Sequence, residues 1–173
     1  ETTVSYEVMH GNYSVMPNDV LQQIMHKHLS RRGGIIYDHD ENEFAQAIYK
    51  TLLDPKASIG DQEKILPYQP IHGYGSTDVG DVSWLVPTAG ARIASWVPGT
   101  PGHSWQAVAS GGTTIGLKGT KLAVQVLAET AKEIYLNPSI ALKAKKELES
   151  RVGKDFEYVP LLGDRDPPLD YRN

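Results

Sequence analysis

The feature that most constrains the fold of this chain is an alternation of two hydrophobic patterns. Short, β-branched or apolar segments typical of strands occupy residues 2–8 (TTVSYEV), 34–38 (GIIYD) and 91–97 (ARIASWV). Longer segments in which apolar residues recur at helical spacing lie between and after them. Strands that alternate with helices predict a layered α/β domain, to which we do not expect the opening strand to belong.

Four helices are expected from this spacing. The first follows a cap at Asn18 or Asp19 and ends at Gly33, and the second runs from about Glu41 to the Asp54–Pro55 pair. The third covers about residues 117–136 and the last about residues 139–152, with Asn137 and Pro138 between them. Residues 56–74 lack periodicity and predict a long loop.

Composition excludes several kinds of function. The net charge of −4 and the isoelectric point near 5.8 argue against a nucleic-acid or anionic-membrane surface. The sequence contains no cysteine, which excludes disulfides and thiolate zinc sites and is compatible with a cytoplasmic location. We find no apolar run of membrane-spanning length and no signal-peptide pattern. A chain that opens within a strand pattern, without an initiator methionine, is expected to be part of a longer protein.

The stretch GTPGHSWQ, residues 99–106, contains the strongest candidate functional residue. His103 lies among prolines and glycines, where Pro101 restricts the backbone and Gly99 and Gly102 allow another surface to approach closely. A single histidine in such a loop is either an exposed structural residue or a metal ligand. The residues themselves leave both readings open.

A second candidate is the glycine-rich turn formed by Gly75, Ser76, Thr77 and Asp78. Asp78 at the head of an apolar segment is most simply a helix cap. The alternative is that the turn faces a substrate carboxylate through its backbone amides. Both can hold, because capping uses only part of the acceptor capacity of a carboxylate. Tyr74, Trp84 and Trp105 are expected to pack, with an aromatic acyl pocket as the alternative.

The runs YGSTDVGDVSWLVPT, GTPGHSWQAVASGGTTIGLKGTKLAVQVLAETAKEIYLNP and PLLGDRDPPLDY carry a resemblance across essentially the whole chain. In order and spacing they resemble the C-terminal part of the aminobenzoyl-glutamate utilisation subgroup of the zinc-dependent aminoacylase and carboxypeptidase family. The resemblance implies a three-layer α/β catalytic domain that holds two metal ions and carries an α+β lid, which also dimerises.

Domain boundaries also come from the resemblance. Residues 1–15 match the last strand of the lid and the crossing into the catalytic domain. Residues 16–154 match the C-terminal portion of the catalytic domain, and residues 155–173 form an extended tail. A homodimer or higher homo-oligomer is implied.

The chemistry that the resemblance implies is metal-dependent hydrolysis of the amide bond of p-aminobenzoyl-glutamate or a related N-acyl amino acid. His103 matches a metal-ligating histidine of a zinc centre, with manganese or cobalt as alternatives, and residues 75–78 match a segment near the substrate. The general base and the other ligands match no residue of this chain, so the isolated chain is expected to be inactive. The alternative is a non-catalytic binding or assembly module that kept the peptidase fold.

Overall fold

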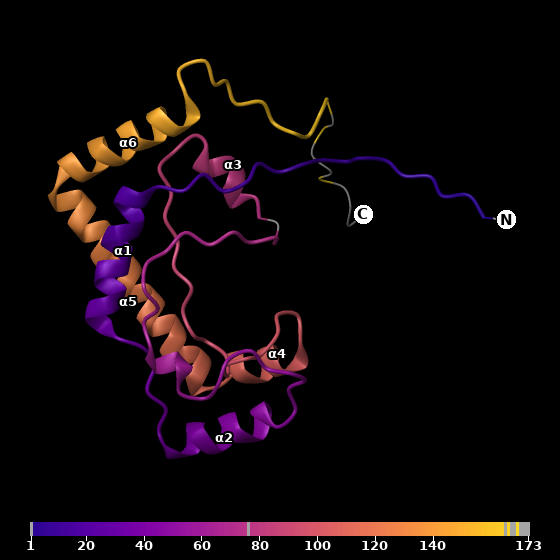
Figure 1. Ribbon diagram of the computed structural model, residues 1–173, viewed down its shortest axis with the longest axis vertical. Helices are drawn as coiled ribbons and strands as arrows, with labels where there is room; N and C mark the ends of the chain where they lie inside the picture. The colour runs from indigo at the N-terminus through magenta and orange to yellow at the C-terminus, as the bar shows by residue number, and fades with distance from the viewer. Residues whose placement is uncertain (1, 76, 165, 167–168, 170–173) are drawn as a thin grey trace.

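The computed structural model describes residues 2–75, 77–164, 166 and 169. Its helices are α1 (Asp19–Arg32), α2 (His39–Tyr49), the short 3-10 helix η1 (Asp61–Glu63), α3 (Val79–Ser83), α4 (Trp105–Gly111), α5 (Thr114–Leu136) and α6 (Pro138–Val152). Figure 1 shows them as an open arc, with α1, α5 and α6 along one side and α2 at one end. Within the described ranges, none of these helices is both long enough and apolar enough to cross a bilayer.

The predicted α/β three-layer fold is wrong, because the described part of the chain contains helices and no strand. All three apolar segments expected to be strands lie outside regular structure. Of the buried middle segment, Ile35 N donates to Gln62 O at 2.7 Å, and no ladder of such bonds follows. A short apolar run predicts burial, whereas a strand also needs a neighbour that pairs with its backbone. The lid strand expected within residues 1–15 does not form in the described part of this range, and residues 2–10 are exposed.

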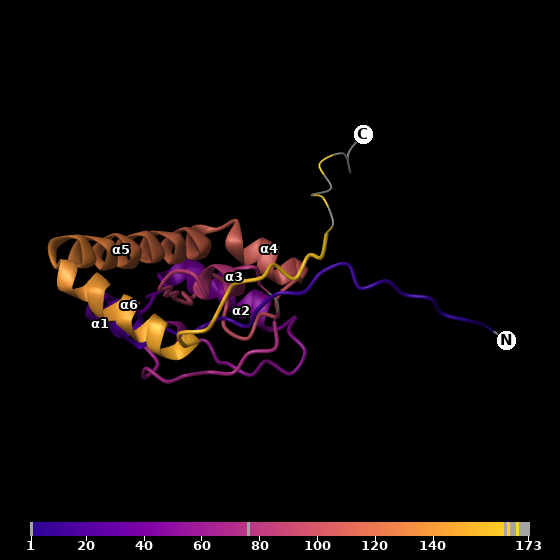
Figure 2. The same ribbon diagram turned by 90° about the horizontal axis from the view of Figure 1, so that it is seen from above.

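The hydrophobic core lies along the contact between α1 and α5 and includes residues of α2. Figure 2 shows α5 along one edge of the molecule, with α1 and α6 beside it. Buried side chains come from these helices and from the irregular segments between them: Met25, Ile35, Tyr37, Ala45, Ile48, Val97, Ile115, Leu122 and Val126. The apolar segments predicted as strands therefore do contribute Ile35, Tyr37 and Val97 to the core. They do so without regular backbone pairing.

Side-chain caps fix where the helices begin. The Asn18 side chain accepts a hydrogen bond from Leu21 N at 3.2 Å, as expected from the sequence, and its amide nitrogen donates to Ala144 O at 2.9 Å. That second bond joins α1 to α6. Asp38 caps α2 in a capping box with Glu41, so α2 begins two residues before the expected Glu41. It ends at Tyr49, five residues before Asp54.

Charged side chains also connect α1 with α5. Lys27 Nζ lies 2.5 Å from Glu133 Oε1, and Nε2 of the buried His28 lies 2.7 Å from the other oxygen of the same carboxylate. Arg32 pairs with Glu129. The hydrogen bond from Lys27 is the largest single cause that lowers the pKa of Glu133 below its ordinary value. These contacts hold α1 against α5 on the side away from the core.

The segment before α1 contacts the segment after α6. Gly11 N donates to Leu161 O at 2.8 Å, and the Tyr13 hydroxyl donates to Val159 O at 3.1 Å. Tyr13 also meets Phe156 edge to face, with ring centroids 6.4 Å apart. Described residues beyond Gly153 form no helix, and residues 161–164 form turns. The domain boundaries inferred from the resemblance stay predictions.

Candidate functional site

The loop that carries His103, residues 99–104, is fixed at both ends by local hydrogen bonds. Thr100 N donates to Val97 O at 3.1 Å, which closes a turn before the loop. The Ser104 hydroxyl donates to Pro101 O at 2.7 Å and accepts from Ala107 N at 3.2 Å, which caps α4. We call this segment the His103 loop. Its position is therefore set by the start of α4.

His103 itself adopts a left-handed backbone conformation, with φ of +57°. Non-glycine residues rarely do so, although histidine is among the types that tolerate it best. Its side chain is exposed and forms no hydrogen bond or ion pair with the described residues. Such a conformation costs about 1–3 kcal/mol and is more frequent at functional sites than elsewhere. The loop thus presents an unused imidazole to the outside.

The neighbouring glycines differ in what they contact. Gly99 has φ of +83°, and a Cβ built on it would lie 2.6 Å from Pro55 Cβ, so only glycine fits this approach. The close approach expected here is confirmed. At Gly102 a Cβ would have no atom within 4 Å, so no described residue makes such an approach there. Gly99 therefore packs the loop against residues 55–57, whereas the backbone at Gly102, next to His103, is not covered by described residues.

The second candidate segment, residues 75–78, is exposed on the approach to α3, and Ser76 lies outside the described residues. Asp78 occupies the position before α3, but its side chain forms no capping hydrogen bond, so the helix-cap interpretation is wrong. The Thr77 hydroxyl instead accepts from Val79 N at 3.3 Å. A Cβ on Gly75 would meet no atom within 4 Å. Asp78 therefore keeps its full acceptor capacity.

Three residues in and beside α3 make tertiary contacts that the sequence analysis did not predict. A Cβ on Gly80 would lie 1.8 Å from Tyr13 O, so α3 packs directly against that backbone. Asp81 accepts from the Tyr158 hydroxyl at 2.9 Å, and Trp84 Nε1 donates to Ser14 O at 2.8 Å. The hydrogen bond to Asp81 is the largest cause that raises the pKa of Tyr158. In the sequence, only the glycine and acidic residues of GSTDVGD could have indicated that Gly80 and Asp81 anchor α3.

The three aromatic residues expected to pack divide into two groups. Trp84 packs against Tyr13 and Phe156 in tilted geometry, with ring centroids 5.3 Å and 4.8 Å away, and its expected packing role is confirmed. Tyr74 is fully exposed and Trp105 is 60% exposed, so packing was the wrong expectation for both.

The His103 loop and the described residues of the second segment, Gly75, Thr77 and Asp78, lie on the open side of the arc in Figure 1. No hydrogen bond or ion pair joins them in the part of the chain that the structure describes. Nor do the described residues contain a group of three histidine, aspartate or glutamate side chains placed to hold a metal ion. Since a catalytic zinc site takes about three protein ligands, His103 with its described neighbours does not fit such a site. We therefore derive no chemical step through a metal.

With this geometry established, comparison with known proteins gives a class: the chain is similar to one component of a hydrolase. That relative is the B subunit of p-aminobenzoyl-glutamate hydrolase from Escherichia coli (strain K12), with 30% identity over 186 aligned positions. The alignment includes 93% of this chain and 39% of the relative, so the chain spans about two fifths of the relative's length. The predicted resemblance is confirmed. No protein-family model and no solved structure matches the chain.

Proposed function

We propose that this chain is part of an enzyme that hydrolyses the amide bond of p-aminobenzoyl-glutamate or a related N-acyl amino acid. The observation that supports the proposal is the similarity to a component of p-aminobenzoyl-glutamate hydrolase along 93% of the chain. The alternative, a non-catalytic binding or assembly module, shares that similarity but predicts no dependence of turnover on His103.

His103 is the residue through which we expect the chain to act. Its imidazole is exposed, lacks a partner among the described residues, and sits on a loop held by the cap of α4 and by the contact between Gly99 and Pro55. We propose that it is one ligand of a divalent metal ion, zinc first and manganese or cobalt as alternatives. The other ligands would come from polypeptide outside the described residues. A neutral imidazole suits this role because it offers one lone pair to the ion.

Residues 75–78 are the proposed substrate-binding segment. Asp78 and the backbone of Gly75 are exposed, and both are free to meet a polar ligand. The predicted homo-oligomer and the predicted cytoplasmic location stay predictions.

The experiment that tests the proposal measures release of p-aminobenzoate from p-aminobenzoyl-glutamate by the complete gene product that carries this sequence. His103→Ala is expected to lower turnover by about 100-fold or more, since loss of a correctly placed group at the reacting centre has effects of that size. The control is His39→Ala, another exposed histidine, at the start of α2. Circular dichroism checks that both variants fold.

Two results would contradict the proposal. Equal turnover in wild type and His103→Ala would remove His103 from the reaction and favour the assembly module. An equal loss in His39→Ala would show that the effect is not specific to the loop.

A further inference from the structure

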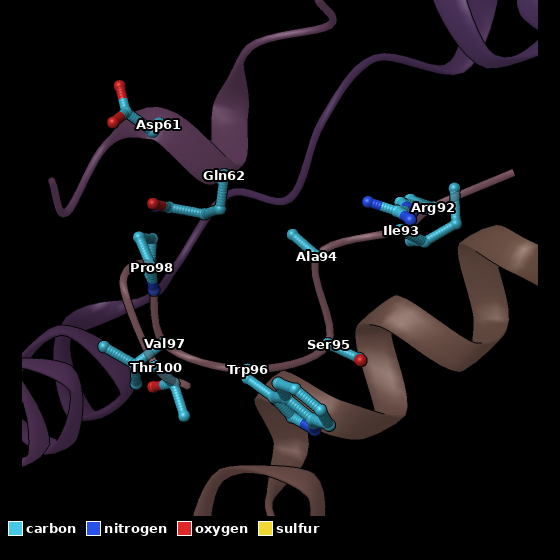
Figure 3. A pocket seen from close by; sticks show the side chains of 10 residues that line it. All are labelled: Asp61, Gln62, Arg92, Ile93, Ala94, Ser95, Trp96, Val97, Pro98 and Thr100. Carbon is cyan, nitrogen blue, oxygen red and sulfur yellow. The ribbon is translucent and has the colours of Figure 1, made fainter. Parts of the chain in front are cut away.

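A hollow of about 520 Å³ lies between η1 and residues 92–100. Figure 3 shows residues 92–100 curving around it, with Arg92 at one end and Pro98 and Thr100 at the other. Its volume is within the range of small-molecule clefts. We call it the Arg92 hollow.

Arg92 supplies the hollow with a positive charge that no described residue neutralises. The residue is exposed and forms no ion pair within the described ranges of the chain. The nearest acidic lining residue, Asp61, is already engaged: its carboxylate accepts from Ser58 N at 2.8 Å and from Lys64 Nζ at 2.7 Å. The hydrogen bond from Lys64 is the largest cause that lowers the pKa of Asp61. The Arg92 guanidinium is therefore available to an anion from outside.

Gln62 supplies an unused hydrogen-bond donor at the opposite end. This side chain is only 5% exposed, and its Oε1 accepts from Gly60 N at 2.7 Å. The Nε2 group has no acceptor among the described residues, and in Figure 3 the side chain reaches into the hollow above Pro98. The Nε2 atom is not fully buried, so it is open to the hollow and can donate to an external carbonyl.

Between Arg92 and Gln62, the hollow is lined by backbone groups that lack hydrogen-bond partners. The backbone N–H and C=O groups of Ile93, Ala94 and Ser95 form no hydrogen bond within the described chain. These residues are held in place from the other side, because a Cβ on Gly119 of α5 would lie 2.6 Å from Ala94 O. Trp96 also lines the hollow, but in Figure 3 its indole is turned away from it. Backbone polar groups without partners suit a ligand that carries an amide.

We infer that the Arg92 hollow binds a small amide that carries a carboxylate, of the N-acyl amino-acid class. Arg92 pairs with the carboxylate, and Gln62 Nε2 donates to the amide carbonyl. A guanidinium is well suited to this pairing, because its planar fork can meet both carboxylate oxygens. The choice of an N-acyl amino acid among carboxylates rests on the proposed function.

Isothermal titration calorimetry of the full chain with p-aminobenzoyl-glutamate tests the inference. Wild type is expected to bind saturably, and Arg92→Ala to bind about 10-fold more weakly or worse. Arg31→Ala is the matched control, since Arg31 is an exposed arginine on α1 without an ion pair to the described residues, and it should bind as wild type does. The diamide of the ligand, which lacks negative charge, should bind wild type and Arg92→Ala equally.

Gln62→Glu gives a second variant that keeps an oxygen acceptor for Gly60 N while it removes the donor. It should weaken binding about 10-fold with unchanged circular dichroism. The inference is overturned if wild type does not bind, if Arg92→Ala binds as wild type does, or if Arg31→Ala loses as much affinity as Arg92→Ala.

Calorimetry measures binding and the assay of p-aminobenzoate release measures turnover. Failure of the inference about the Arg92 hollow can therefore be distinguished from failure of the proposed function. Specific binding in a protein whose His103→Ala variant retains full turnover would support the Arg92 hollow and contradict the role of His103. Loss of turnover in His103→Ala without binding at Arg92 would do the reverse.

Discussion

Thr100 buries a hydroxyl that has no hydrogen-bond partner in the described part of the chain. A buried polar group without a partner costs about 1–3 kcal/mol relative to an apolar group of the same shape. Thr100→Val removes the hydroxyl and keeps the shape. We therefore expect this substitution to raise the free energy of unfolding by about 1 kcal/mol.

The same substitution at Thr130 is the control. Thr130 is 4% exposed and donates to Val126 O at 2.7 Å, so its hydroxyl is satisfied. Thr130→Val is expected to leave stability unchanged or to lower it. Urea unfolding followed by circular dichroism measures both. A loss of stability in Thr100→Val would mean that its hydroxyl has a partner after all.

At the scale of single residues, the sequence predicted positions whose role is local. Asn18 caps α1, as a side chain that reaches three residues along the chain can be expected to do. Asp78 has an equally good local pattern and caps nothing. The tight position at Gly80 depends on Tyr13, 67 residues away in sequence, and no local pattern contains that information.

Between elements, Glu147 of α6 makes the most extensive connection to α1. Its two oxygens accept from Asp19 N at 2.8 Å and from Val20 N at 2.9 Å, and Arg151 Nε donates to it at 3.0 Å. Burial opposes ionisation and is the largest single cause acting on this carboxyl, but the backbone donors and Arg151 together lower its pKa below the ordinary value. The folded structure therefore favours the ionised form of the Glu147 carboxyl.

This pKa predicts how stability depends on pH. A carboxyl whose pKa is lower in the folded than in the unfolded state stabilises the fold above the unfolded value of about 4.3. That contribution is lost as pH falls through the folded pKa, since both states are then protonated. Glu147→Gln is expected to lower the free energy of unfolding by about 1–2 kcal/mol at pH 7, with the difference from wild type shrinking below about pH 4.

Urea titrations of wild type and Glu147→Gln across this pH range measure the effect. Glu149→Gln is the control on the same helix, because Glu149 is 61% exposed and its nearest cation, Lys145 Nζ, is 3.8 Å away. A difference between wild type and Glu147→Gln that stays constant from pH 7 to pH 3 would contradict the assignment.

The longer helices α1, α2, α5 and α6 were predictable as elements, whereas α4 and the lack of a sheet among the described residues were not. Periodicity in a single segment, such as the apolar positions from Ile115 to Val126, determines a helix because all its backbone hydrogen bonds are internal. The segment 91–97 has the composition of a strand, but whether it forms one depends on a partner elsewhere. Here Gly119 of α5 takes the place beside Ala94 that another element could have occupied.

At the scale of the whole molecule, the candidate functional residues are distributed along one open side instead of gathered in a closed site. The sequence singled out His103 and Asp78, and both remain without side-chain partners among the described residues. It could not indicate their relative placement, which depends on how α3 and α4 pack against distant segments.

This distribution leads to a prediction about metal binding by the isolated chain. Catalytic zinc takes about three protein ligands, and the described residues bring no three histidine, aspartate or glutamate side chains together. A single imidazole such as His103 binds zinc weakly, because tight binding requires several protein ligands on the same ion. After dialysis we expect much less than one equivalent of zinc per chain by atomic absorption, with no difference between wild type and His103→Ala.

The complete gene product should retain zinc and lose it with His103→Ala. Stoichiometric zinc in the isolated wild-type chain, lost in His103→Ala, would show that these residues form a complete site by themselves.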